Sequence, residues 1–437
     1  MPSKPRINFT RPPQWDAERQ AGLRVTEEMK TLIAKPGFLN SENGGPRLRY
    51  LYANESLQFA ISHLELFAMA CYFGNIEHVT KGMQSSDPPD LSKKETPFEW
   101  GYASLVVLGS QRVATTEGGP RVDHLEVLRY LIPHGLSLDV SDIAGYTALH
   151  HTVLAPTPKQ KKMTKALLKA GANVNCQNKW GETPVHAAMA RDDIVGLEIF
   201  LEAGADVTIK DGNGAVASGG HVVCGPRVSA TVQKWLRIRS GTAHPPMAEK
   251  ACARCGDKKS ALKSCGRCRT VQYCSTECQG ASWKSHKQSC KPFDEASSLT
   301  VKPHYANGAK SYPRSELERG SILGLPTKPV LVSHLRASNV PDDIPSGGKQ
   351  FVIKIQAPNA VYAPAPDGSY MGLYVYTWKR DFVCSIRRDT SPADYDRLTN
   401  IIRQNPPSYQ KVYFAATLKS PQELVIKVSE VLADQPW

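Results

Sequence analysis

Residues 252–290 read CARCGDKKSALKSCGRCRTVQYCSTECQGASWKSHKQSC. The stretch holds seven cysteines and one histidine in four short pairs, spaced C-x2-C, C-x2-C, C-x3-C and H-x3-C. Zinc takes four thiolate or imidazole ligands at about 2.0–2.3 Å, and two ligands this close in sequence can face one ion. The spacing therefore predicts two zinc ions, held by Cys252, Cys255, Cys265, Cys268, Cys274, Cys278, His286 and Cys290.

Both zinc sites are predicted to be structural. Four protein ligands per ion leave no coordination position for a reactive water. The residues between the ligands include too few apolar side chains to form a core. Metal binding should therefore supply the folding free energy of this segment, on the order of 10–16 kcal/mol for a structural zinc peptide. We expect the segment to be unfolded without zinc.

The order of the ligands, the pair Tyr273-Cys274 and the run from Cys278 through Trp283 to Cys290 resemble a MYND finger, which all eight ligand positions match. The resemblance covers residues 252–290 of a chain of 437. It implies interleaved coordination, with the first and third pairs on one ion and the second and fourth on the other. The spacing alone leaves open a sequential pairing, in which the first four ligands hold one ion and the last four hold the other.

MYND fingers bind peptides, and the resemblance implies a groove for short proline-containing segments. The positions that contact the peptide in such fingers are Gln279 and Trp283 in this sequence. An extended proline-rich peptide loses little conformational entropy on binding, and an indole offers it a flat apolar surface. The alternative is that Trp283 only packs the small finger. Gly266 follows Cys265, so any side-chain contact from that position is lost and peptide preference could differ.

Upstream of this segment the chain repeats itself. Residues 145–150, GYTALH, recur as GETPVH at 181–186, and Gly171 and Gly204 stand thirty-three residues apart in matching phrases. These phrases resemble ankyrin repeats, which are helix pairs that stack on their neighbours. The threonine of each phrase can cap a helix and the histidine can bridge neighbouring loops. We therefore expect His150 and His186 to be structural.

Two further repeats are predicted with a weaker signature. One spans residues 66–83, and the other opens at Thr96-Pro97-Phe98 and contains an insertion near 108–123. A helix over about 228–239 is predicted to cap the far end of the stack. A helix over 16–35, ended by Pro36-Gly37, is predicted to dock against the first repeat as the other cap.

We predict a multidomain fold with an all-α ankyrin solenoid, a small two-zinc MYND finger and a C-terminal α+β domain. In the last domain, strands are expected at 351–355, 372–378, 382–386 and 412–415, and helices at 394–403 and 421–432. No family is recognised for that domain. The predicted boundaries are 1–55 for the N-terminal segment with a capping helix, 56–238 for the repeats, 239–250 for a linker, 251–291 for the finger, 292–348 for an irregular linker and 349–437 for the α+β domain.

The chain is basic, with 54 Lys and Arg against 41 Asp and Glu. Residues 250–291 hold ten basic residues and two acids, but seven thiolates (−7) and two zinc ions (+4) would reduce that +8 to +5. Tyr273 and Trp283 are too few aromatic residues for a base-stacking platform. The charge therefore favours acidic or polyanionic partners in general and disfavours specific nucleic-acid recognition, although a nucleic-acid-binding regulator stays an alternative.

The cellular compartment of the protein is predicted from its apolar segments and its cysteines. The sequence has no secretory signal and no apolar run of eighteen residues, so no membrane attachment is predicted. The four cysteines outside the finger, Cys71, Cys176, Cys224 and Cys384, are scattered singly, which fits a reducing compartment. We therefore expect an intracellular protein of the cytoplasm, the nucleus or both.

The main enzymatic alternative is a lysine methyltransferase, because MYND fingers occur inserted in SET methyltransferases. The sequence shows no Gly-x-Gly followed by an Asn-His pair after the finger, and no phosphate loop, His-Glu-x-x-His or Gly-x-Ser-x-Gly. We therefore predict an adaptor and not an enzyme. Its ankyrin face and its finger would each dock a protein or a proline-containing peptide, in transcriptional or signalling regulation.

Overall fold

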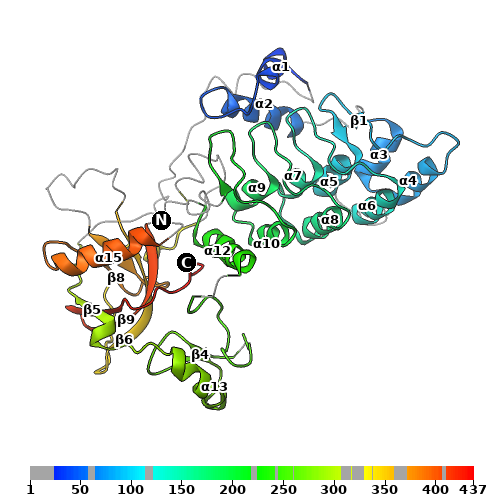
Figure 1. Cartoon of the computed structure of the whole chain (residues 1–437). Helices are drawn as coiled ribbons and strands as arrows, with labels where there is room; N and C mark the ends of the chain where they lie inside the picture. The colour runs from blue at the N-terminus through cyan, green and yellow to red at the C-terminus, as the bar shows by residue number, and fades with distance from the viewer. Residues whose placement is uncertain are drawn as a thin grey trace, which may run out of the picture. The chain divides into compact units, whose positions relative to one another are not determined.

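The structure is a computed structural model that describes residues 24–57, 64–113, 122–217, 224–241, 245–258, 260–306, 316, 329–336, 338–358, 372–405 and 410–437. The chain divides into two compact units, Met1–Cys224 and Gly225–Trp437, and Figure 1 traces their elements in chain order. Among the described residues, no helix is both long enough and apolar enough to cross a bilayer.

The first unit is a row of stacked helix pairs, as the repeats predict (Figure 1). A short hairpin of β1 (Lys94–Glu95) and β2 (Trp100–Gly101) precedes α5, so the unit is not purely helical. The helices of the row are α3 (Leu66–Phe73), α4 (Ile76–Met83), α5 (Tyr102–Arg112), α6 (His124–Leu131), α7 (Ala148–Thr152), α8 (Pro158–Lys169), α9 (Pro184–Ala190) and α10 (Ile194–Glu202).

Threonine and histidine open α7 and α9 as predicted, but Thr96 does not open a helix: it lies in the turn between β1 and β2, and α5 begins only at Tyr102. Thr147 and Thr183 form capping boxes at the starts of α7 and α9, with His150 and His186 as the third helical residues. The Nε2 of His150 lies 3.0 Å from the carbonyl oxygen of Glu182 in the next loop. Burial lowers the pKa of His150 to about 4, so its imidazole is neutral and donates this hydrogen bond.

Three loop tips between the repeats have the same type of turn. In each, a side-chain oxygen accepts the backbone N–H groups of the residues two and four positions further on, which fixes the loop without a strand. The acceptors are Asp142, Asn178 and Asp211. Backbone hydrogen bonds then join neighbouring tips: Ile143 donates to Phe98, Lys179 to Ala144 and Gly212 to Trp180.

The N-terminal segment does not cap the first repeat, which corrects the prediction. Its helices α1 (Glu27–Ala34) and α2 (Gly45–Leu57) lie along the loop tips (Figure 1). The Leu39 N–H donates to the Lys179 carbonyl, and the Trp180 indole donates to the Gly45 carbonyl. The part of the predicted 16–35 helix before residue 24 lies outside the described residues. α2 was not predicted, because its apolar residues follow no helical period.

An antiparallel six-stranded sheet forms the centre of the second unit, in the order β5-β10-β9-β6-β7-β8. One face of the sheet packs against α15 (Pro392–Gln404), and apolar side chains from all six strands join Leu398 and Ile402 in one core. The strands are β5 (Ser298–Val301), β6 (Lys349–Gln356), β7 (Leu373–Tyr376), β8 (Val383–Ile386), β9 (Lys411–Ser420) and β10 (Glu423–Lys427).

The four strands predicted in this domain and the helix over 394–403 are confirmed by β6, β7, β8, β9 and α15. The helix predicted over 421–432 is wrong. That stretch contains β10, whose Leu424 and Ile426 are fully buried and which pairs with both β9 and β5. Ser420 and Pro421 resemble a helix start, but here the Ser420 hydroxyl accepts the Gln422 N–H in the turn before β10.

The stretch predicted as an irregular linker also contributes to the sheet, because β5 is its edge strand. The 3-10 turns Glu295–Ser297 and Val332–Leu335 belong to the same stretch, of which residues 307–315 and 317–328 are outside the described part. The helix predicted over 228–239 is present as α12 (Pro226–Ser240). It belongs to the second unit and not to the repeats, and the Ser229 hydroxyl contacts Asp434 at 3.3 Å.

Candidate metal centres in the finger

Short elements position the eight candidate ligands. A two-stranded ribbon of β3 (Lys263–Ser264) and β4 (Gln272–Tyr273) is followed by α13 (Thr276–Ser289). The Ser275 hydroxyl caps α13 by accepting the Cys278 N–H at 3.2 Å. Cys278 and His286 therefore project from the first and third turns of one helix, and Cys290 stands where that helix ends.

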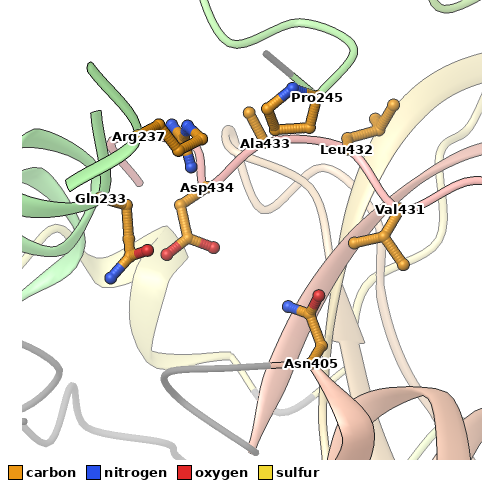
Figure 2. A pocket seen from close by; sticks show the side chains of 8 residues that line it. All are labelled: Gln233, Arg237, Pro245, Asn405, Val431, Leu432, Ala433 and Asp434. Carbon is orange, nitrogen blue, oxygen red and sulfur yellow. The ribbon is translucent and has the colours of Figure 1, made fainter. Parts of the chain in front are cut away.

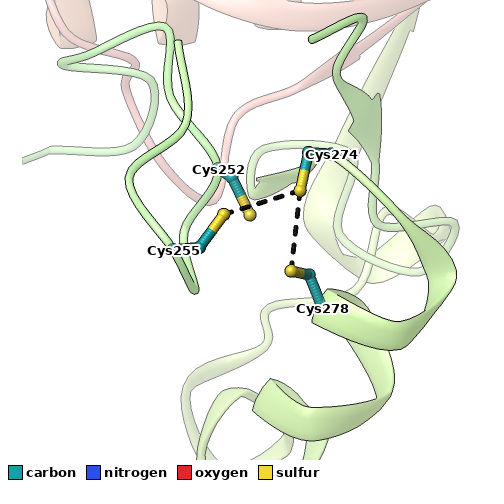
Figure 3. Close-up of side chains that lie close together, drawn as sticks. All are labelled: Cys252, Cys255, Cys274 and Cys278. Carbon is teal, nitrogen blue, oxygen red and sulfur yellow. Dashed lines mark hydrogen bonds between the residues drawn. The ribbon is translucent and has the colours of Figure 1, made fainter. Parts of the chain in front are cut away.

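The eight residues come together as two groups of four. Within each group the ligand atoms all lie within 4.8 Å of one another, and Figure 3 shows the four thiols of the first group facing one point. The first group is Cys252, Cys255, Cys274 and Cys278, and the second is Cys265, Cys268, His286 and Cys290. The structure thus groups the residues in the interleaved order and not in the sequential one.

The distances between ligand atoms fit zinc. A tetrahedral ion with zinc–sulfur bonds of about 2.3 Å requires sulfur atoms about 3.8 Å apart. In the first group the Cys274 sulfur lies 3.6 Å from the Cys255 sulfur and 3.5 Å from the Cys278 sulfur. In the second group the Cys268 sulfur lies 3.5 Å from Nε2 of His286. Each group could therefore hold one zinc ion with no position left for substrate.

The thiols of the first group cannot all ionise by themselves. Hydrogen bonding with Cys278 and then with Cys252 raises the pKa of Cys274 to about 12. Backbone N–H groups, that of Cys255 first, lower the pKa of Cys252 to about 6. A divalent cation resolves this conflict, because it stabilises every thiolate of the group at once.

The two predicted peptide contacts lie one turn apart on α13. Trp283 is 36% exposed, and Gln279 is half-buried. The Trp283 ring also meets the His286 ring edge-on at 5.9 Å. The indole therefore both packs on a candidate ligand and presents a surface to solvent. A Cβ at Gly266 would meet no atom within 4 Å, so packing does not require glycine at that position.

Sequence reasoning missed the contact between the finger and the sheet. The fully buried Lys427 of β10 donates to the carbonyl oxygens of Cys268 and Lys291, both at 2.9 Å, and pairs with Glu430. Thr270 also donates to Glu430 at 3.2 Å. Cys268 is a candidate ligand, and Lys291 directly follows the candidate ligand Cys290. Lys427 therefore joins two separate parts of the backbone that carry ligands of the second group. In the sequence, Lys427 is recognisable only as a lysine at the end of an apolar segment, and nothing near it indicates that it contacts the finger.

A small hollow of about 100 Å³ lies beside α12 in the same unit (Figure 2). Small-molecule sites typically measure about 300–1,000 Å³. The hollow is therefore too small to be proposed as a substrate site. Its lining residues are Gln233, Arg237, Pro245, Asn405, Val431, Leu432, Ala433 and Asp434.

Comparison with known families agrees with this geometry. A family model for the MYND finger matches residues 252–290, and one for ankyrin repeats (many copies) matches residues 153–201. The chain contains a MYND finger and ankyrin repeats.

Relatives share only parts of this chain. A SET and MYND domain-containing protein of Dictyostelium discoideum is 51% identical over 41 residues, 9% of this chain and 8% of the relative. SET domain-containing protein 14 of Caenorhabditis elegans is 49% identical over 43 residues, 10% of each chain. BCL-6 corepressor-like protein 1 of Homo sapiens is 36% identical over 99 residues, 22% of this chain and 5% of the relative. The chain spans only 12% and 21% of the length of two further curated relatives.

Proposed function

We propose that this protein is a zinc-binding adaptor, in which the ankyrin repeats and the MYND finger each hold a protein partner. Ankyrin repeats and MYND fingers generally mediate protein interactions. The observation that carries the proposal is the pairing of two closed four-ligand groups with a solvent-facing indole, Trp283, on the helix that supplies two of the ligands. Two zinc ions would hold that helix in shape, and the indole would provide a contact surface.

For the finger, we propose a short proline-containing peptide as the ligand. Gln279 would hydrogen-bond the peptide backbone, and Trp283 would stack on a proline ring. The two positions stand on one face of α13, one turn apart, so a single extended peptide can touch both. Two sites on one chain also raise the effective concentration of a partner that carries both motifs.

The test compares two exposed tryptophans of the same unit. Full-length chain, Trp283→Ala and Trp378→Ala are applied to an array of proline-containing peptides, with zinc content measured for each. Trp378 is 61% exposed in the sheet domain and serves as the matched control. If Trp283 is a contact residue, its loss should weaken binding by about 30-fold, while Trp378→Ala binds like the parent. Equal binding by all three proteins would refute the role of Trp283.

We also propose that the chain is not an enzyme. The likeness to proteins named for SET and MYND domains extends over 41 and 43 residues, about the length of the finger. Incubation of the full chain with labelled S-adenosylmethionine and a panel of proteins should give no methyl transfer. Transfer that is lost on heating the chain would favour the methyltransferase instead. Nanomolar, sequence-dependent nucleic-acid binding at physiological salt would favour a nucleic-acid-binding regulator.

A further inference from the structure

The loop tips of the ankyrin unit carry a row of aromatic side chains that the N-terminal segment covers. Phe98 and Trp100 are fully buried, and Trp180 is 4% exposed. The Phe98 and Trp100 rings lie 5.7 Å apart, and the Tyr146 and Trp180 rings lie 5.6 Å apart. Trp and Tyr side chains gathered in this way are typical of the energetic centre of a protein interface.

Tyr52 of α2 is inserted in the middle of this row. Its ring stacks on Phe98 at 5.1 Å and lies 5.2 Å from Tyr146. Its hydroxyl donates to the buried carboxylate of Asp142 and accepts the Trp100 indole N–H at 3.4 Å. The side chain therefore occupies an aromatic and acidic pocket that the loop tips of two repeats provide.

Arg49 makes the second anchor, one turn before Tyr52. Its guanidinium lies 4.5 Å from the Trp180 ring centre and donates to both Glu182 carboxylate oxygens, at 3.0 and 3.2 Å. A two-pronged arginine–carboxylate pair fixes orientation as well as adding attraction. Arg49 and Tyr52 thus contact a different carboxylate each, as an arginine and a tyrosine of a partner helix would.

Hydrogen bonds with side chains on the loop tips extend the interface along the chain. The Lys179 ammonium donates to the carbonyl oxygens of Lys35 at 2.7 Å and Gly37 at 3.1 Å, and Ser41 donates to Asn213. These partners stand on loop tips, whereas the helices α3 to α10 pack on one another. The contacts of Arg49, Tyr52 and Lys35 described above are with the loops and with β2, whereas the helices of the repeats also pack on one another.

We propose that residues 35–56 are a tethered ligand of the ankyrin loop face, so that this face is closed until the segment leaves it. The regulation rests on the proposed partner-binding role of the repeats. A partner that uses this face would have to displace Arg49 and Tyr52 from Glu182 and Asp142. It would also compete with a covalent tether, which raises the effective concentration of the segment.

The test supplies the segment as a separate peptide, so it needs no outside partner. A fluorescent peptide of residues 35–56 is titrated with the full chain and with the full-length variant Arg49→Glu/Tyr52→Ala, and anisotropy is recorded. The variant, whose own segment is weakened, should bind the peptide at least about tenfold more tightly than the parent chain. A peptide with the same two substitutions should not bind the variant.

Two controls separate this mechanism from unspecific loosening. Lys30→Ala changes an exposed residue of α1 that pairs with Glu27, and this chain should behave like the parent. When Glu182→Arg is added to the variant chain, the charge of the Arg49 partner is reversed. This chain should bind a peptide with Arg49→Glu more tightly than the unchanged peptide. The proposal is overturned if the variant binds the peptide no better than the parent. It is equally overturned if hydrogen exchange shows that the variant loses amide protection throughout α3 to α10, because the segment is then a fixed part of the fold.

Discussion

At the scale of single residues, the chain buries an amine on the second face of the sheet. Lys354 of β6 stands in register between Tyr376 of β7 and Tyr413 of β9, and its ammonium lies 5.1, 5.2 and 5.6 Å from the ring centres of Tyr376, Tyr413 and Trp437. The residue is 4% exposed. Burial, and next the nearby Arg380, lower its pKa to about 7 from the ordinary 10.5. The aromatic rings favour the charged form, but loss of water outweighs them.

This shift predicts a pH dependence of stability. Between pH 7 and 10.5 the unfolded chain binds more protons at Lys354 than the folded chain, so stability should rise with pH across this window. Going from pH 7 to pH 9, the gain should be roughly 2 kcal/mol. Urea unfolding of zinc-saturated full chain at the two pH values measures it. Lys411, whose burial lowers its pKa to about 8, adds a slope of the same sign.

Lys354→Met should reduce this slope and stabilise the unit at pH 7, because the thioether fills the same space without a charge to desolvate. The matched control is Lys419→Met, which changes a lysine of β9 whose side chain is 57% exposed, and it should leave the slope unchanged. A Lys354→Met chain that keeps the full slope would show that burial of this amine does not govern the pH dependence.

Residues whose partners are near in sequence could be predicted, and residues with distant partners could not. The eight candidate ligands and the Thr147–His150 capping box follow from spacings of a few residues, which chelation and helix geometry impose locally. Arg49 meets Glu182 across 133 positions, and Lys427 meets Cys268 across 159. No pattern of neighbouring residues in the sequence predicts contacts over such separations.

At the scale of elements, the finger and β10 form one joined structure. Lys427→Ala would leave the carbonyls of Cys268 and Lys291 without the buried ammonium and would remove the cation that pairs with Glu430, which keeps the hydrogen bond from Thr270. Removing one partner of a buried ion pair costs about 3–5 kcal/mol. We therefore expect zinc to leave the second group, Cys265 to Cys290, at least about tenfold faster when the chain is challenged with a chelator, with little change at the first group.

A colorimetric chelator measures the rate of zinc release, with one kinetic phase expected from each ligand group. Hydrogen exchange over residues 265–291 then shows which phase belongs to the second group. Lys263→Ala changes an exposed lysine of β3 within the same finger and provides the control. If both lysine variants release zinc at the parent rate, Lys427 does not support the second group.

Elements also show where pattern reading fails. The segments that form β6 to β9 were predicted as strands because they are short runs rich in β-branched and aromatic residues, and each supplies side chains to the core beside α15. β10 also contains an apolar run, Leu424 to Ile426, but a serine and a proline before it resemble a helix start, and pairing with two neighbouring strands overrides that signal. α2 was missed because its apolar residues follow no helical period, since it contacts both α1 and the loop tips of the repeats.

At the scale of the whole molecule, the architecture of repeats, finger and sheet domain could be read from the sequence, and the uses of their surfaces could not. Repeats and zinc spacings have strong periodic signals. The covering of the ankyrin loops by residues 35–56 and the joining of the finger to the sheet arise from contacts between segments that carry no such signal. Both features change the adaptor hypothesis: residues 35–56 already occupy the ankyrin loop face, and the finger is hydrogen-bonded to the sheet through Lys427.

We expect two fully ligated zinc ions to take the place of a hydrophobic core and to hold the α13 surface in shape. The most direct test is the zinc content of the purified full chain, measured by elemental mass spectrometry after dialysis against metal-free buffer. We predict two zinc ions per chain. One zinc ion or none, in a chain whose residues 252–290 are still protected from hydrogen exchange, would contradict it.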